Sequence, residues 1–84
     1  MSTQPPQSEL KSRLARFREL MDNRGITAAL ITNDQNVRYL SGFTGDSSAL
    51  LITQKRKFML TNFIYKEEAQ NTARGWRQVL KPPQ

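Results

Sequence analysis

The side chains that most often carry out chemistry in enzymes are sparse in this sequence. It contains no histidine and no cysteine, so it lacks imidazole and thiolate metal ligands, a histidine base and any catalytic triad. The aspartates, Asp22, Asp34 and Asp46, are far apart, and their spacing does not predict a hard-cation site. We therefore expect no metal site, no cofactor and no catalytic residue within these 84 residues.

A loop between two glycines, Gly42-Phe43-Thr44-Gly45, is the segment that most suggests a specific contact. Glycine lets the backbone turn sharply, and such a turn would hold Phe43 outward as an apolar contact. Arg38, shortly before the loop, would offer a planar cation to a carboxylate. The alternative interpretation is that Tyr39 and Phe43 pack in a small core.

Basic residues outnumber acidic ones by 13 to seven, which gives a formal net charge of +6. Such a charge suits an acidic partner such as nucleic acid, although it is also typical of a surface that is merely well solvated. A phosphate-binding face would draw on the first predicted helix and the tip of a predicted hairpin, through Lys11, Arg13, Arg16, Arg18, Arg24, Lys55, Arg56 and Lys57.

The glycine loop also matches the Gly-x-x-Gly pattern with which KH domains clamp a nucleic-acid backbone. A KH loop joins two helices and usually carries basic residues, whereas this loop leads toward a predicted strand and has Phe43 and Thr44 between its glycines. The context therefore argues against a nucleic-acid partner.

The first half of the chain shows a helix followed by a strand. Residues 1–7 are polar and contain two prolines, so we expect a disordered leader. From Ser8, which we expect to cap a helix, apolar residues recur at helical spacing until Gly25 ends the pattern. Residues 26–32 (ITAALIT) are apolar on both alternating faces, which predicts a strand covered on both sides.

Asn33 and Asp34 are suited to capping a short helical turn that leads into the glycine loop. Residues 48–53 and 58–63 then form two strand-like runs joined by a short polar connection, which predicts a hairpin. A second helix is predicted over residues 64–74, with a stripe of Tyr65, Ala69, Ala73 and Trp76, before a last short strand at Val79 and Leu80.

This order of elements predicts an α/β domain with a mixed sheet and flanking helices. Two helices are few for a sheet whose strands are apolar on both faces, so we expect the fold to be incomplete and to be finished by a partner or by further sequence. Residues 1–12 lack the apolar stretch typical of a signal peptide, and no later apolar run is long enough to cross a bilayer, so we expect a cytoplasmic location and no membrane contact.

The segment RLARFRELMDNRGITAALITNDQNVRYLSGFTGDSSALLIT, residues 13–53, resembles the opening of the creatinase/prolidase N-terminal domain. This is the non-catalytic front domain of Xaa-Pro aminopeptidases, Xaa-Pro dipeptidases (prolidases) and creatinase. The most specific piece is NVRYLSGFTGDSSALLIT, residues 36–53. The resemblance implies that residues 8–84 form a partial domain of this type, without the pita-bread catalytic domain that normally follows.

In such enzymes the second domain binds two divalent metals, commonly manganese, cobalt or zinc, which activate a water against the Xaa-Pro bond. The resemblance implies that this chain has no peptidase activity of its own. Its role would be to form oligomer contacts and to wall the active-site cleft, with Arg38, Tyr39, Phe43 and Thr44 as contact residues. The implied partners are further copies of the chain or a catalytic domain of the same family.

Two features depart from the family pattern. Family members typically have Thr-Asp-x-Arg-Tyr after the hairpin, whereas here Asn62 and Ile64 replace the aspartate and the arginine, so a charged pair is lost. The chain also stops short of the family's usual front domain. Two other interpretations therefore remain: a small basic nucleic-acid-binding module, and a stand-alone domain that associates with itself.

Overall fold

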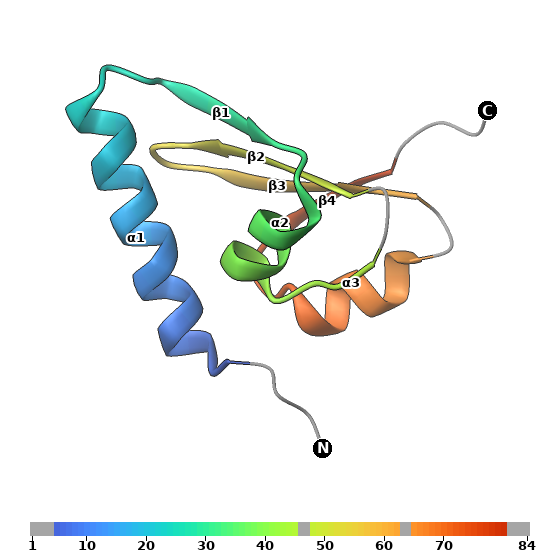
Figure 1. The fold of residues 1–84 in the computed structure, drawn as a ribbon. Coiled ribbons are helices and arrows are strands. Elements are labelled where there is room, and N and C mark those ends of the chain that lie inside the picture. The colour runs from blue at the N-terminus through green and yellow to red at the C-terminus, as the bar shows by residue number, and fades with distance from the viewer. Residues whose placement is uncertain (1–4, 46–47, 63–64, 81–84) are drawn as a thin grey trace.

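The computed structural model describes residues 5–45, 48–62 and 65–80, which form three helices and one four-stranded sheet (Figure 1). The strands lie in the order β1-β2-β3-β4, with β1 and β3 antiparallel to β2, and β4 parallel to β3. The predicted α/β class with a mixed sheet is therefore confirmed. In chain order the elements are α1 (Gln7–Asn23), β1 (Ala28–Ile31), α2 (Asp34–Ser41), β2 (Ala49–Thr53), β3 (Lys57–Thr61), α3 (Lys66–Thr72) and β4 (Arg77–Leu80).

Helix α1 begins at Gln7, one residue before the predicted start, and Pro6 occupies the cap position without a side-chain cap. The predicted Ser8 cap is therefore wrong. The Pro6 carbonyl accepts hydrogen bonds from the amides of Glu9 and Leu10, at 3.0 and 3.2 Å, so Ser8 already lies inside the first turn. Most of the predicted leader, residues 1–4, lies outside the described residues.

The predicted end of α1 is confirmed. Gly25 has a φ of +68°, a left-handed conformation that glycine adopts without a steric penalty. Its amide donates to the Asp22 carbonyl at 3.1 Å, and the Ile26 amide donates to the Met21 carbonyl at 2.8 Å. These two bonds satisfy carbonyls that the helix end would otherwise leave without partners.

Strand β1 lies at an edge of the sheet and one of its faces is exposed, so the prediction that residues 26–32 form a strand covered on both sides is wrong. Within the described residues β1 pairs with β2 alone, and Leu30 is 61% exposed. A run such as AALI has the same apolar character whether or not its second face is covered. Only the placement of the helices distinguishes the two cases.

Helix α3 connects β3 to β4 and so provides the crossover that a parallel pair requires. The Tyr65 amide, just before α3, lies 3.3 Å from the Oδ1 atom of Asn62, which ties the end of the hairpin to the helix start. Ala69 and Ala73 are fully buried, and their small side chains let α3 approach the core closely. The predicted stripe is thus confirmed, while Phe63 and Ile64 lie outside the described residues.

One face of the sheet carries the core, and all three helices lie on that side (Figure 1). Leu50 and Ile52 of β2 and Met59 of β3 are fully buried there. The helices and the connecting segments contribute Leu14, Met21, Val37, Leu40, Phe43, Ala69, Ala73 and Trp76.

The opposite face, which we call the outer sheet face, is also apolar. In the strand register Leu30 lies beside Leu51, and Leu51 lies beside Phe58, while Leu60 lies beside Val79. Leu30 and Val79 are exposed and the other three side chains are half-buried. None of the described helices covers this face, and none of them is long and apolar enough to cross a membrane.

Substitution of Leu14 tests the packing of α1. Leu14 is only 5% exposed, so Leu14→Ala should lower the free energy of unfolding by about 2 to 5 kcal/mol, as expected when a buried leucine leaves a cavity. Leu20 of the same helix is 46% exposed, and Leu20→Ala is the matched control, with an expected change within about 0.5 kcal/mol. Denaturant unfolding followed by circular dichroism measures both. Equal stability of wild type and Leu14→Ala would refute the assigned helix face.

Candidate functional site

Helix α2 presents the residues that the sequence singled out. Asn33 caps it, because its Oδ1 atom accepts hydrogen bonds from the amides of Gln35 and Asn36 at 2.9 and 3.2 Å. Gly42 ends it with a φ of +81°, and its amide donates to the Arg38 carbonyl at 2.8 Å. The predicted capped turn is thus confirmed, with Asn33 as the capping residue.

Phe43 points into the protein, so the expectation that the glycine loop holds it outward is wrong. The residue is 1% exposed, and its ring meets the Tyr65 ring edge to face, with centroids 6.0 Å apart. Its amide donates to the Ser41 hydroxyl at 3.1 Å, and that hydroxyl donates to the Val37 carbonyl at 2.6 Å. Gly45 is required for this packing because a Cβ atom there would meet Cζ of Phe43 and lie 2.7 Å from Cε2.

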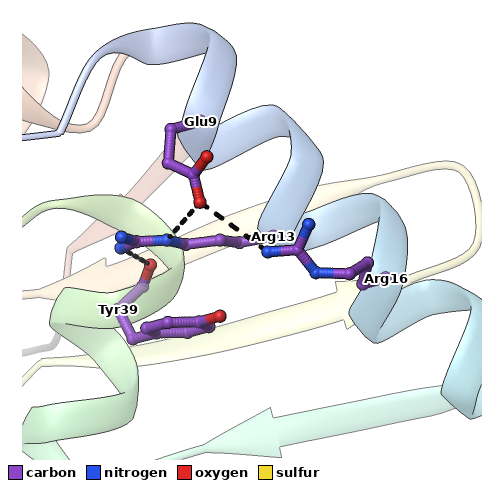
Figure 2. Close-up of polar contacts among 4 residues, drawn as sticks. All are labelled: Glu9, Arg13, Arg16 and Tyr39. Atoms are coloured by element: carbon purple, nitrogen blue, oxygen red, sulfur yellow. Dashed lines mark hydrogen bonds and ion pairs between the residues drawn. The ribbon is translucent and has the colours of Figure 1, made fainter.

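Tyr39, by contrast, is 48% exposed, so the alternative in which it packs in the core is wrong. The Arg13 guanidinium lies over the Tyr39 ring, 4.3 Å from its centroid, and Nη1 of Arg13 donates to the Tyr39 carbonyl at 3.0 Å (Figure 2). This cation–π contact fixes α2 against α1 at the protein surface.

Glu9 forms ion pairs with both Arg13 and Arg16 (Figure 2). Its Oε2 atom lies 3.2 Å from Nε of Arg13 and 3.7 Å from Nη2 of Arg16. Hydrogen bonding with the Tyr39 side chain is the main cause of a raised pKa for Arg16, with a smaller contribution from Glu9. This arginine is charged at neutral pH in any case.

Of these side chains, Arg13, Arg16 and Tyr39 border a surface hollow of about 310 Å³ between α1, α2 and β1. Arg13, Arg16, Asn36 and Tyr39 are its polar lining residues, while Phe17, Leu20, Ile31 and Leu40 are its apolar ones. Two guanidinium groups beside an apolar wall can bind a carboxylate or stack on a planar group. The described residues that line the hollow include no carboxylate.

The predicted site residues therefore separate in the structure. Tyr39 borders the hollow, Phe43 lies in the core beneath the loop, and Arg38 and Thr44 are exposed and do not line the hollow. Sequence reasoning did not assign Glu9 and Arg13 to this site. Their spacing of four residues on a helix predicts an ion pair and was the available signal.

The part of the chain that the structure describes brings no three His, Cys, Asp or Glu side chains together as metal ligands. The described residues therefore do not fit a divalent metal centre.

Comparisons with known proteins find relatives that are similar in both sequence and fold. A family model described as the creatinase/prolidase N-terminal domain matches residues 13–83. The uncharacterized peptidase YqhT of Bacillus subtilis (strain 168) is 36% identical over 67 residues, which are 80% of this chain and 19% of that protein. An Xaa-Pro aminopeptidase structure from Streptococcus pyogenes has a TM-score of 0.87 at 30% identity, and the match covers 90% of this chain and 59% of that one.

A third relative is the N-terminal, creatinase/prolidase-like domain of a protein described as a metallopeptidase from Corynebacterium diphtheriae. Its crystal structure has a TM-score of 0.82 at 25% identity, and the match covers 86% of this chain and 59% of that one. The chain thus spans about a fifth of the curated relative and about three fifths of the two solved structures.

A substitution at Gly45 tests the inward packing of Phe43. Gly45→Ala should lower the free energy of unfolding by about 1 to 3 kcal/mol, because the added methyl group overlaps the Phe43 ring. In a Phe43→Leu background the same change should cost less, since the smaller side chain leaves room. Thr44→Ala, at the exposed neighbouring residue, is the control. Equal costs of Gly45→Ala in both backgrounds would contradict the packing described here.

Proposed function

This chain belongs to the creatinase/prolidase N-terminal domain family, and we propose that it is the non-catalytic front domain of a metal-dependent Xaa-Pro aminopeptidase or dipeptidase. In this role it packs against a catalytic domain of the same family, contributes subunit contacts and walls the substrate cleft. The proposal includes a cytoplasmic location.

The outer sheet face is the observation that carries the proposal. Leu30, Leu51, Phe58, Leu60 and Val79 gather on one side of a sheet whose described helices all pack on the other side. An apolar sheet face is stable when another layer of protein covers it. A domain with such a face is suited to working in contact with further protein.

The surface near α2 supplies polar contacts for the same role. Arg38, Tyr39 and Thr44 are exposed, and the Arg13–Tyr39 contact holds this part of α2 in place. In our proposal these three side chains face the substrate cleft or a neighbouring subunit, where Arg38 binds a carboxylate. Phe43 takes no direct part and supports the loop from beneath.

The chemistry belongs to the catalytic domain in this proposal. That domain binds two divalent ions, manganese, cobalt or zinc, which supply an activated water for hydrolysis of the Xaa-Pro bond. The described residues of this chain form no ligand cluster for such ions, so no step of the reaction is assigned to them.

An activity measurement tests the non-catalytic role. The purified chain should not hydrolyse Xaa-Pro dipeptides or Xaa-Pro-containing peptides above the rate in buffer, with or without added manganese. A full-length Xaa-Pro peptidase assayed in parallel shows that the conditions support turnover. Hydrolysis that coelutes with the chain through successive columns would refute the proposal.

The outer sheet face also favours self-association as a second candidate function for the chain by itself. In light scattering the purified chain should have a mass above that of the monomer, and Leu30→Lys should lower it by placing a charge on the outer sheet face. Leu20→Lys changes an equally apolar, exposed position on α1 and should leave the mass unaltered. A monomeric wild-type chain with a cooperative thermal melt would show that the outer sheet face needs no cover.

A further inference from the structure

Two further hollows, which adjoin each other, are lined by many cations, and the first of them shares Leu40 with the hollow beside Tyr39. The first, of about 270 Å³, has Lys11, Lys57 and Arg74 in its wall. The second, of about 250 Å³, shares Lys57 and adds Arg18, Lys55, Arg56 and Arg77. Together these side chains, which we call the cationic face, are seven of the 13 basic residues of the chain.

Lys57 lies where the two hollows meet and is half-buried. Its ammonium group lies 5.2 Å from the centroid of the Trp76 ring, and its side chain passes beside Gly75. Burial lowers the pKa of Lys57, and the neighbouring charges of Arg18 and Lys11 lower it further. The fold thus holds the Lys57 ammonium group where burial and neighbouring positive charges disfavour its protonated form.

Arg18 joins α1 to the hairpin within the same face. Its Nε and Nη2 atoms donate to the carbonyls of Thr53 and Arg56, both at 2.8 Å, and the Gln54 side chain donates back to the Arg18 carbonyl at 3.1 Å. Burial lowers the pKa of Arg18 as well. These bonds join the hairpin tip to α1 through backbone oxygens, and the ion pairs of the described residues include no carboxylate beside Arg18.

No carboxylate is present among the described residues that line either hollow. The ion pairs of the described part join Glu9 to Arg13 and Arg16, on the side of α1 that faces α2. Like charges held close together destabilise a fold unless a counter-charge is supplied. The cationic face is therefore best satisfied by a ligand that brings several negative charges.

We propose that the cationic face binds an acidic segment of another polypeptide, in which glutamates or aspartates alternate with apolar residues. Carboxylates of the segment pair with Lys57, Arg74 and Arg77, and its apolar side chains lie against Leu10, Leu40 and Phe58 in the walls of the hollows. The cationic face adjoins the outer sheet face, with which it shares Phe58, and the inference does not depend on the proposed peptidase role.

The walls of the hollows favour a polypeptide over nucleic acid. Single-stranded nucleic acid is bound largely by stacking of its bases on exposed aromatic rings. Trp76 is only 7% exposed and lies beneath Lys57, while Phe58 is half-buried in the sheet. The leucines in the wall of the first hollow, beside its cations, instead match a chain that carries both carboxylates and apolar side chains.

The chain's single tryptophan makes the test direct, because Trp76 lines the first hollow. A synthetic peptide of glutamates interspersed with leucines should change Trp76 fluorescence saturably at low salt, and added salt should weaken its binding. The same peptide with glutamines in place of glutamates is the control for charge, and oligothymidine is the control for nucleic acid. Both should bind more weakly than the acidic peptide.

Charge-removing variants locate the site. Lys57→Met keeps the aliphatic stem over Trp76, and Arg74→Gln changes an exposed residue. Each variant should weaken peptide binding by about tenfold. Lys66→Gln removes an exposed charge elsewhere and should leave affinity unchanged, which separates a local effect from net charge. If circular dichroism shows that Lys57→Met is unfolded, Arg74→Gln decides alone.

Several results would overturn the inference. These are no binding of the acidic peptide at low salt, equal binding of the glutamine peptide, or tighter binding of oligothymidine. An equal loss of affinity in Lys66→Gln and Arg74→Gln would likewise show that net charge, rather than the cationic face, attracts the peptide.

Discussion

The inner surface of the sheet is the constraint on which the rest of the structure depends. Leu50, Ile52 and Met59 are fully buried there, and each helix must turn its apolar stripe toward them. In so small a chain, the packing of the helices against this face of the sheet is the main source of stability. The direction of α1, the close approach of α3 and the path of the loop after α2 all follow from this requirement.

The glycine loop shows how this constraint acts locally. An exposed phenylalanine after α2 would forgo burial, whereas an inward ring fills the space between α2 and Tyr65. Gly42 provides the left-handed turn, and Gly45 leaves room for the ring. The two glycines thus serve the core, and the exposed contact surface lies on the neighbouring turn of α2, around Tyr39.

Placing three helices on one face leaves two other surfaces for contact. The outer sheet face is apolar, and the cationic face is positive at the tip of the hairpin. The first suits a broad interface with a packed layer, and the second suits a smaller, charge-matched ligand. The basic residues of α1 divide accordingly, since Arg13 and Arg16 pair with Glu9 near α2, while Lys11 and Arg18 belong to the cationic face.

Local patterns in the sequence determined the existence and order of the elements. Apolar spacing, the Asn33 cap, the left-handed Gly25 and the polar turn of the hairpin act over a few residues, and the structure confirms each of them. The family resemblance likewise rested on a contiguous stretch of chain. The tertiary structure alone decided that β1 is an edge strand, that Phe43 turns inward and Tyr39 outward, and that cations distant in sequence share one face. Those outcomes depend on which surfaces meet, because the burial of a side chain and the charges around it are set by its neighbours in space rather than in sequence.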